Sequence, residues 1–182
     1  SDTPEGNRYT DSLALLSLYN NLNGEFWHGS YQNWKTANSL EDFDGIKVDT
    51  FSGRVIELIL PDRNVKGNIP SEIMDLTKLK SLTINLSEIN SLNAEFGYFS
   101  SLEELTLINI SSDKFPTSIS QLSSLVKLYI HKSDLKMIPE WVFSLSNLQH
   151  LEITHSELDA ISPRVAELRA LTQVRFENNF IK

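Results

Sequence analysis

Cysteine is absent from this sequence of 182 residues, and glycine occurs only seven times. Without cysteine there can be no disulfide bond, no thiol nucleophile and no cysteine-ligated zinc site. The sequence also lacks a glycine-rich phosphate-binding loop, a GxSxG motif and an HExxH motif. The common catalytic signatures are therefore missing, and we predict neither catalytic residues nor a cofactor.

Basic residues and long apolar runs are also scarce. The 16 lysines and arginines are outnumbered by 24 acids, which gives a formal charge of −8, whereas nucleic-acid affinity depends on basic side chains that neutralise phosphates. No stretch approaches the roughly 20 apolar residues of a membrane-spanning helix. We therefore predict no nucleic-acid partner and no transmembrane segment. The chain begins with Ser1 rather than a methionine, which suggests that an upstream segment has been removed.

A pattern that recurs every 23 residues dominates the rest of the chain. The segments LKSLTINLSEI, LEELTLINISS, LVKLYIHKSDL and LQHLEITHSEL begin at residues 79, 102, 125 and 148. A related segment begins at residue 55, where the spacing to the next segment is one residue longer than 23. Another begins at residue 171, in step with the others. Residues 55–182 are therefore predicted to form six turns of a repeat, the last of them truncated.

The apolar positions within a turn predict its structure. In the fourth turn they are Leu125, Leu128, Ile130, Leu135, Ile138, Val142 and Leu145. Alternation with polar residues predicts a strand with one buried face, and the later spacing of four and then three predicts a short helical turn. Because one turn cannot bury these side chains alone, neighbouring turns must stack. The sequence predicts an α/β solenoid with a parallel sheet on one side and helical or 3-10 turns on the other.

These motifs resemble the leucine-rich repeat, LxxLxLxxN followed by a variable segment. The segment LILPDRNVKGNIPSEIMDLTKL resembles the plant-type repeat, in which Gly67 is the additional residue. The resemblance implies a right-handed, horseshoe-shaped solenoid with the sheet on its concave face. It covers residues 55–182.

Residues 1–54 resemble the N-terminal cap of plant and bacterial leucine-rich repeat proteins, although the cysteines of plant caps are missing. We expect a helix that begins at Thr10 or Asp11 and ends near Asn23 and Gly24. Its apolar surface is predicted to comprise Leu13, Leu15, Leu16, Leu18 and Tyr19. The residues predicted to cover the first turn are Trp27, Trp34 and Phe43. The segments GIKVD and RVIEL, joined by TFSG, are predicted to form a hairpin.

The repeat departs from the family pattern in two places. The residues at the usual asparagine position are Arg63, Ser87, Ile110, Ser133, Ser156 and Asn179. A serine hydroxyl can replace part of the asparagine hydrogen bonding. Ser112 stands at a position that is otherwise apolar, which predicts an irregular bend in the third turn.

At the far end, Phe176 and Ile181 would lie at an open edge that further chain, a partner or a second copy could cover.

Function is expected on the outward positions of the sheet. In the first three turns the charged residues there are Glu57, Asp62, Lys80, Glu103 and Glu104. Later turns are more basic, and Tyr129 is a typical aromatic anchor. The candidate ligand-binding residues are Glu104, Thr106, Lys127, Tyr129, His131, Lys132, His150, Glu152, His155, Arg175 and Glu177. The alternative is an ordinary solvated face.

Three histidines lie on this predicted face. The repeat places His131 beside Thr154, so His155 is close to it on a neighbouring strand roughly 4.8 Å away, whereas His150 is at the other end of its strand. A metal site would require His131, His155 and Glu177, but no compact metal motif is present. We predict no metal site and interpret the imidazoles as pH-sensitive hydrogen-bonding groups.

The resemblance implies a non-enzymatic module that binds a protein or peptide through the concave sheet. It further implies an extracellular or cell-surface location, and the absence of cysteine favours a bacterial relative. An alternative is a carbohydrate-binding or adhesive domain in which Tyr129 and Trp141 stack on sugars. A metal-dependent site at His131 and His155 is the third hypothesis, and self-association through the open C-terminal edge is a further option.

Overall fold

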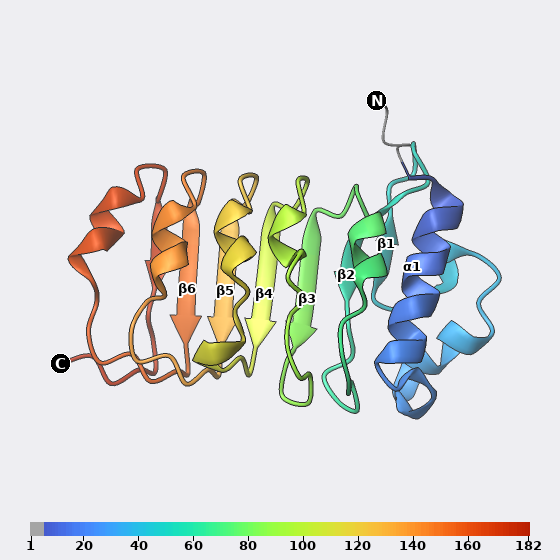
Figure 1. Cartoon of the computed structure of the whole chain (residues 1–182), viewed down its shortest axis with the longest axis horizontal. Helices are drawn as coiled ribbons and strands as arrows, with labels where there is room; N and C mark the ends of the chain where they lie inside the picture. The colour runs from blue at the N-terminus through green and yellow to red at the C-terminus, as the bar shows by residue number, and fades with distance from the viewer. Residues whose placement is uncertain (1–5) are drawn as a thin grey trace.

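The computed structural model describes residues 6–182 and is an arched solenoid (Figure 1). Its helix α1 spans Arg8–Asn21, and its strands are β1 (Ile46–Val48), β2 (Val55–Ile59), β3 (Ser81–Asn85), β4 (Glu104–Ile108), β5 (Lys127–His131), β6 (His150–Thr154) and β7 (Gln173–Arg175). They form one sheet in sequence order. The first two strands pair antiparallel, as the predicted hairpin requires, and every later pair is parallel.

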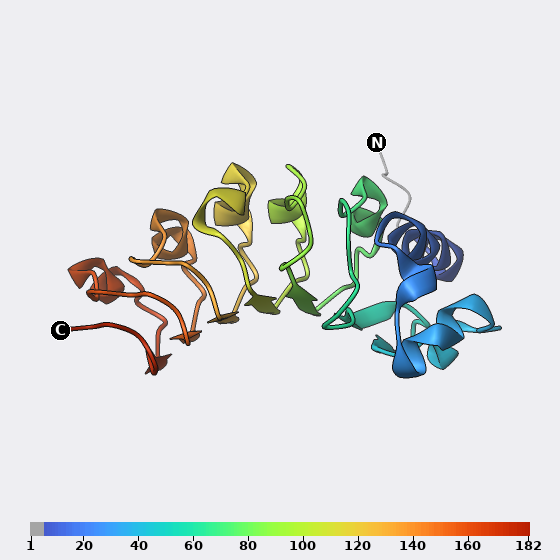
Figure 2. The same ribbon diagram turned by 90° about the horizontal axis from the view of Figure 1, so that it is seen from below.

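Short 3-10 helices lie on the side opposite the sheet. Those of the repeats are η4 (Ser71–Asp75), η5 (Phe96–Tyr98), η6 (Ser112–Lys114), η7 (Thr117–Gln121), η8 (Glu140–Ser144) and η9 (Pro163–Glu167). Figure 2 shows the strands along the inner side of the arch and these helices along its outer side. The predicted solenoid, with a parallel sheet on its concave face, is confirmed. Within residues 6–182, no helix is long and apolar enough to span a membrane.

The core is a stack of equivalent side chains from successive turns. Leu82 pairs in register with Leu105, Leu105 with Leu128, and Leu128 with Leu151, and all four are completely buried. Burial of one leucine side chain is worth about 1.5–3 kcal/mol. The 23-residue period therefore determines both the strand register and the composition of the core.

Hydrogen bonds at the asparagine position explain how serine is accommodated. The hydroxyl oxygens of Ser133 and Ser156 lie 2.8 Å apart, and the backbone N–H of Ser133 donates to the Ser156 hydroxyl at 3.2 Å. Asn179 donates from its side-chain amide to the carbonyl of Ile153 at 2.8 Å. Ile110 is instead buried in the core. Serine thus replaces part of the asparagine hydrogen bonding, as predicted.

The irregular bend predicted in the third turn is also present. The additional 3-10 helix η6 begins at Ser112, and no other turn of the described chain has a counterpart. The backbone N–H of Ser112 donates to Oδ1 of Asp134 in the next turn at 2.8 Å. The bend is therefore attached to the fourth turn through a polar contact instead of an apolar side chain.

The predicted start of the N-terminal helix was wrong. Helix α1 begins at Arg8, because Asn7 caps it by accepting hydrogen bonds from the N–H groups of Tyr9 and Thr10. Its end at Asn21 agrees with the prediction, since Asn23 adopts a left-handed conformation with φ of 62°. On its surface, Leu15 and Leu18 are buried, whereas Leu13 and Leu16 are about half exposed.

Asp11 has a different role from the predicted cap. Its carboxylate is buried and accepts hydrogen bonds from Nε of Arg54 at 2.9 Å, from Nη2 of Arg54 at 2.8 Å and from the N–H of Val55 at 2.8 Å. The aromatic residues form a separate cluster in the cap, near the C-terminal end of α1: the rings of Trp27 and Trp34 are 5.1 Å apart, edge to face, and the indole N–H of Trp27 donates to the carbonyl of Leu22. The ion pair and the aromatic cluster together connect α1 to the first strand of the repeat.

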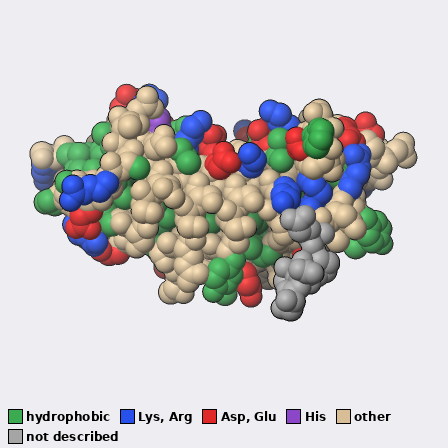
Figure 3. Space-filling model, turned by 90° about the horizontal axis from the view of Figure 1, so that it is seen from above, with side chains coloured by type: hydrophobic (Ala, Val, Ile, Leu, Met, Phe, Trp, Pro, Cys, Tyr) green, Lys and Arg blue, Asp and Glu red, His purple; other side chains and the backbone are tan. Residues whose placement is uncertain are grey.

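The C-terminal edge is apolar and uncovered in this structure. Val174 is 52% exposed and Phe180 66% exposed, whereas the equivalent Leu151 of the preceding turn is buried. Figure 3 shows hydrophobic side chains gathered at this end of the solenoid. The predicted exposure of Ile181 is present, and Phe176 is partly buried.

Candidate functional site

The outward side chains of β4 to β7 form a continuous surface on the concave side. The strand register aligns Thr106 with Tyr129, Tyr129 with Glu152, and Glu152 with Arg175. We call the surface of β4 to β7 centred on this row the concave surface. Figure 3 shows acidic and basic side chains interleaved on the sheet side of the molecule. The repeat therefore brings residues that are 23 positions apart into direct lateral proximity.

Tyr129 lies at the centre of the concave surface between two imidazole rings. Its ring centroid is 6.2 Å from that of His131, in a stacked arrangement, and 5.0 Å from that of His150. Burial raises the pKa of the Tyr129 phenol, and the negative charge of Glu104 raises it further. The phenol is therefore protonated at neutral pH and can donate a hydrogen bond to a ligand.

Glu152 is the electrostatic centre of the same cluster. Its side chain is only 13% exposed, and its carboxylate oxygens lie 3.9 Å from Nδ1 of His131, 3.7 Å from Nε2 of His150 and 3.7 Å from Nη1 of Arg175. A partly buried carboxylate is stabilised by such neighbours. The sequence identified each of these residues but not their convergence on one carboxylate.

His131 is held mainly in its neutral form. Its Nδ1 forms a 2.8 Å hydrogen bond with the hydroxyl of Thr154. Burial lowers the pKa of His131; Glu152 opposes this effect, while the positive field of His155, Arg175 and Lys132 adds to it. The ring can therefore accept or donate a proton when a ligand changes the local charge.

His150 carries an unpaired polar atom. Its Nδ1 is hydrogen-bonded to Oε1 of Gln173 at 2.7 Å, but its Nε2 is buried and has no hydrogen-bond partner among the described residues. Most buried polar atoms in proteins have such a partner. The unpaired nitrogen lies next to Tyr129 and Glu152, so a ligand bound there could provide the missing hydrogen bond.

A hollow of about 360 Å³ lies beside this cluster, where β5 and β6 end. Its lining residues are Ile108, His131, Lys132, Glu152, Thr154, His155 and Arg175. We call it the concave hollow. His131 and His155, which sequence spacing placed near each other, both line it. Nε2 of His155 also accepts a hydrogen bond from the Asn178 side-chain amide at 3.1 Å.

The metal hypothesis receives no structural support. Within residues 6–182, no group of three or more histidine, cysteine, aspartate or glutamate side chains is arranged to hold a metal ion. Glu177, the third ligand considered, instead accepts a hydrogen bond from Arg175 at 2.7 Å, and this bond lowers the pKa of its carboxyl group. His131, His155 and Glu177 thus lie on one surface without forming a metal site.

The remaining predicted residues lie on the N-terminal side of the concave surface. Lys127 forms an exposed ion pair with Glu104, with 3.1 Å between Nζ and Oε2. Exposed pairs of this kind contribute about 0–1 kcal/mol. Thr106 lies beside Tyr129 in the sheet. These side chains can rearrange at little cost to meet a ligand.

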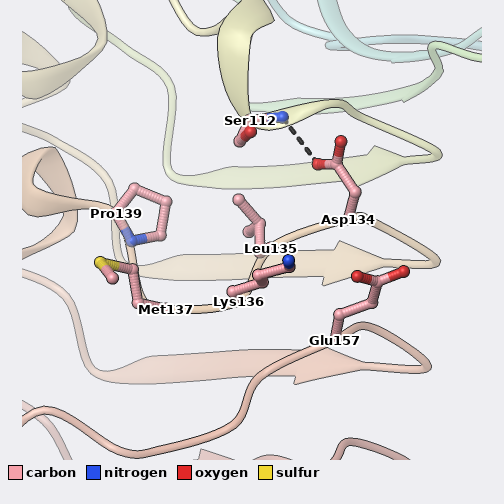
Figure 4. A pocket seen from close by; sticks show the side chains of 7 residues that line it. All are labelled: Ser112, Asp134, Leu135, Lys136, Met137, Pro139 and Glu157. Carbon is pink, nitrogen blue, oxygen red and sulfur yellow. Dashed lines mark hydrogen bonds between the residues drawn. The ribbon is translucent and has the colours of Figure 1, made fainter.

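Sequence reasoning missed a second hollow, which Figure 4 shows from close by. It has a volume of about 520 Å³ and is lined by Ser112, Asp134, Leu135, Lys136, Met137, Pro139 and Glu157. These residues belong to the segments that follow β4, β5 and β6. The one signal in the sequence was Ser112, a polar residue at a position that is otherwise apolar. None of the residues of the Tyr129 cluster lines this hollow.

Trp141 is less available than the sequence suggested. It lies in η8 on the convex side, partly buried, with its ring centroid 5.0 Å from that of Phe115. Its indole N–H is buried without a partner among the described residues. Trp141 therefore packs against a neighbouring turn, on the opposite side of the solenoid from Tyr129.

A family model described as a leucine-rich repeat region matches residues 35–177. The chain belongs to the leucine-rich repeat family. The match includes all the strands and both sides of the solenoid, and it confirms the resemblance that the 23-residue period indicated.

Proteins similar to this leucine-rich repeat protein occur in plants and bacteria. The receptor protein-tyrosine kinase CEPR2 of Arabidopsis thaliana is 36% identical over 74 residues, which are 41% of this chain and 7% of the receptor. The chain therefore spans only a small part of that relative. The ectodomain of the Arabidopsis receptor kinase GASSHO1/SCHENGEN3, solved in complex with CASPARIAN STRIP INTEGRITY FACTOR 2, has a TM-score of 0.69 at 20% identity, covering 94% of this chain and 21% of the receptor chain.

A bacterial structure is also similar. A leucine-rich repeat protein of Leptospira interrogans has a TM-score of 0.57 at 23% identity, covering 67% of this chain and 31% of that protein. At these levels of identity the solved structures show the shared fold alone. The fold is that of leucine-rich repeat proteins, and it occurs in both plant and bacterial proteins.

Proposed function

We propose that this chain is a non-enzymatic binding module that holds a peptide or a protein segment on the concave surface of β4 to β7. The proposal rests on the cluster formed by Tyr129, His131, His150, Glu152 and Arg175, which we call the Tyr129 cluster. A partly buried tyrosine lies between two imidazoles, beside a carboxylate that is close to both imidazoles and to the guanidinium of Arg175, and one ring nitrogen has no partner among the described residues. Aromatic residues in preformed polar surroundings dominate the affinity of many interfaces.

The dimensions of the surface suit an extended peptide. Strands in a sheet are about 4.8 Å apart, so β4 to β7 span about 14 Å, and an extended chain advances about 3.3 Å per residue. A segment of about four or five residues could therefore cross the surface. The concave hollow lies next to its path and can receive one side chain.

Two further parts of the proposal concern the biological context. The similarity to receptor ectodomains supports an extracellular or cell-surface location, and the absence of cysteine favours a bacterial origin. The carbohydrate alternative, in which Tyr129 and Trp141 stack on sugars, has less support. Tyr129 is flanked by His131 and His150, and Trp141 packs against Phe115 on the convex side. We therefore do not propose sugar binding.

A peptide selection followed by calorimetry would test the proposal. Peptides selected from a random display library on the immobilised chain would be titrated into the wild type, Tyr129→Ala and Tyr98→Ala. Tyr98 is an exposed tyrosine of η5 on the convex side and provides a matched control. We expect Tyr129→Ala to weaken binding by about tenfold or more, the usual range for an anchor residue, while Tyr98→Ala binds like the wild type. Equal affinities for all three proteins would contradict the proposal.

A further inference from the structure

A left-handed bend follows the strand in four successive turns, from the third to the sixth. The residues at this bend are Asn109 (φ 57°), Lys132 (φ 54°), His155 (φ 52°) and Asn178 (φ 55°). Residues with a side chain adopt this conformation at a cost, which asparagine tolerates best because its short polar side chain bonds locally. The other two non-glycine residues with positive φ among residues 6–182, at positions 23 and 64, are also asparagines. Lys132 is the exception, because histidine, like asparagine, is enriched in this conformation.

The bend is imposed by the repeat and not by these side chains. The backbone N–H of Asn109 donates to the carbonyl of His131 at 2.9 Å, that of Lys132 to Thr154 at 3.0 Å and that of His155 to Glu177 at 3.2 Å. The same ladder thus exists whether the residue is asparagine or lysine. Asparagine would satisfy the backbone at position 132, so backbone geometry does not explain the lysine there. Unfavourable backbone conformations that persist often indicate a functional site.

Lys132 and His155 both line the concave hollow. The ammonium group of Lys132 has no hydrogen bond or ion pair among the described residues. Arg175 and His131 line the hollow as well, and Glu152 is the one carboxylate among its lining residues. Glu152 is already close to Arg175 and His131. The positive charge of Lys132 is therefore left without a counter-charge at the rim of a site large enough for a small anionic group.

We propose that the ligand of the concave surface places a carboxylate in this hollow, where Lys132 and His155 bind it. The inference rests on the proposed peptide-binding function and specifies its chemistry. Lys132 provides the charge, and His155 provides a hydrogen bond. The carboxylate can come from an aspartate or glutamate side chain of the ligand or from its chain end. In either case the recognised group is the same.

Acidification strengthens this binding. The groups that face His131 are Glu152, Thr154 and Tyr129, together with the cationic Arg175 and Lys132 and the imidazole of His155. A bound carboxylate favours the protonated form of His131, and by linkage the protonated form favours the carboxylate. Affinity for a carboxylate is thus expected to rise as the pH falls from about 8 to about 5.5, across the titration range of histidine.

Three acetylated pentapeptides test the proposal. The first is Gly-Tyr-Gly-Glu-Gly with an amidated end, the second is Gly-Tyr-Gly-Gln-Gly with a free carboxylate end, and the third is Gly-Tyr-Gly-Gln-Gly with an amidated end. Each is titrated to about 10 mM into the full ¹⁵N-labelled chain while amide shifts are followed by NMR, a range that detects millimolar affinity. We expect the amides of Lys132 and His155 to shift at least threefold more with a carboxylate peptide than with the neutral one. The first two peptides identify which carboxylate source is preferred.

Lys132→Asn is the decisive variant, because asparagine suits the left-handed bend. We expect it to lose the preference for carboxylate peptides and to melt at the same temperature as the wild type or about 1–3 °C higher. Lys136→Asn removes the same charge from a residue that lines the other hollow, and it should keep the preference. A lower melting temperature for Lys132→Asn would show that the left-handed bend does not disfavour lysine at this position.

The outcomes separate the two proposals. If all three peptides shift the amides around Tyr129 equally, the peptide-binding function stands and the carboxylate inference is wrong. If Lys132→Asn keeps the preference for carboxylate peptides, the carboxylate inference is likewise wrong and the peptide-binding function stands. If none of the three peptides causes shifts on β4 to β7, the carboxylate inference is contradicted, whereas the peptide-binding function is tested by the library-selected peptides.

Discussion

The ring of Tyr129 lies 5.0 Å from the ring of His150, although the two residues belong to different strands, β5 and β6. This contact is diagonal, because the strand register places His150 beside Lys127 and Tyr129 beside Glu152. Diagonal neighbours in a sheet are within reach of long and aromatic side chains. The cluster on the concave surface thus arises from side-chain length as well as from the repeat.

Replacing Glu152 by glutamine should lower the pKa of His131 further. Glu152 raises this pKa, and its removal leaves burial and the positive charges of His155, Arg175 and Lys132 unopposed. The measurement is an NMR titration of the His131 imidazole. Glu177→Gln is the matched control, since Glu177 pairs with Arg175 and is not among the groups that shift His131. An unchanged pKa in Glu152→Gln would show that the carboxylate does not face the ring.

The free energy of unfolding should decrease as the pH is lowered from about 7 to about 5, and part of this decrease should come from His131. Burial depresses the pKa of His131 in the folded chain below its value of about 6.5 in the unfolded chain. The unfolded chain therefore binds more protons, so the contribution is complete above the unfolded pKa and is lost as the pH falls below it. Urea unfolding at several pH values should show a smaller decrease for His131→Gln than for the wild type. Parallel curves would contradict this assignment.

The buried pair of Asp11 and Arg54 should be sensitive to the loss of one partner. Arg54→Met leaves the carboxylate buried and uncompensated, which typically costs about 3–5 kcal/mol of unfolding free energy. Arg8→Met breaks the exposed ion pair with Glu41 and should cost far less, because water screens that pair. Chemical unfolding of the two variants under identical conditions makes the comparison. A larger loss in Arg8→Met would contradict the structural role of Asp11.

Truncation of the leucine stack should be costly at any central turn. Leu128→Ala removes a fully buried side chain between Leu105 and Leu151 and should cost about 2–5 kcal/mol. Leu13 of α1 is 46% exposed, so Leu13→Ala should lower the free energy of unfolding by less than about 1 kcal/mol. Urea denaturation checks both values. Similar losses would mean that the repeat does not bury Leu128 as described.

Sequence periodicity predicted the parts of the fold that depend on local pattern. Leu128 and Ile130 are buried and Tyr129 faces outward because alternation in a strand leaves no other arrangement. The start of α1 was predicted wrongly because Asp11, a good helix cap by type, pairs with Arg54, which is 43 residues away in the sequence. Composition near the helix carries no signal of such a distant partner.

For the candidate site, the sequence predicted which residues share the concave surface but not how they meet. The convergence of His131, His150 and Arg175 on Glu152 depends on side-chain rotamers and on the twist of the sheet. The left-handed bend at Lys132 and His155 depends on backbone dihedral angles. Ser112, which lines the second hollow, was predicted only to make the bend of the third turn irregular.

The central claim is that ligands bind on the sheet side of the solenoid, and an NMR map of a selected peptide tests it most directly. The ¹⁵N-labelled chain would be titrated with a library-selected peptide, and shifts would be compared between the two sides. We predict shifts in β5 and β6, centred on Tyr129, His131 and His150, with little change at the Trp141 indole on the convex side. Shifts confined to Trp141 and the 3-10 helices would contradict the account.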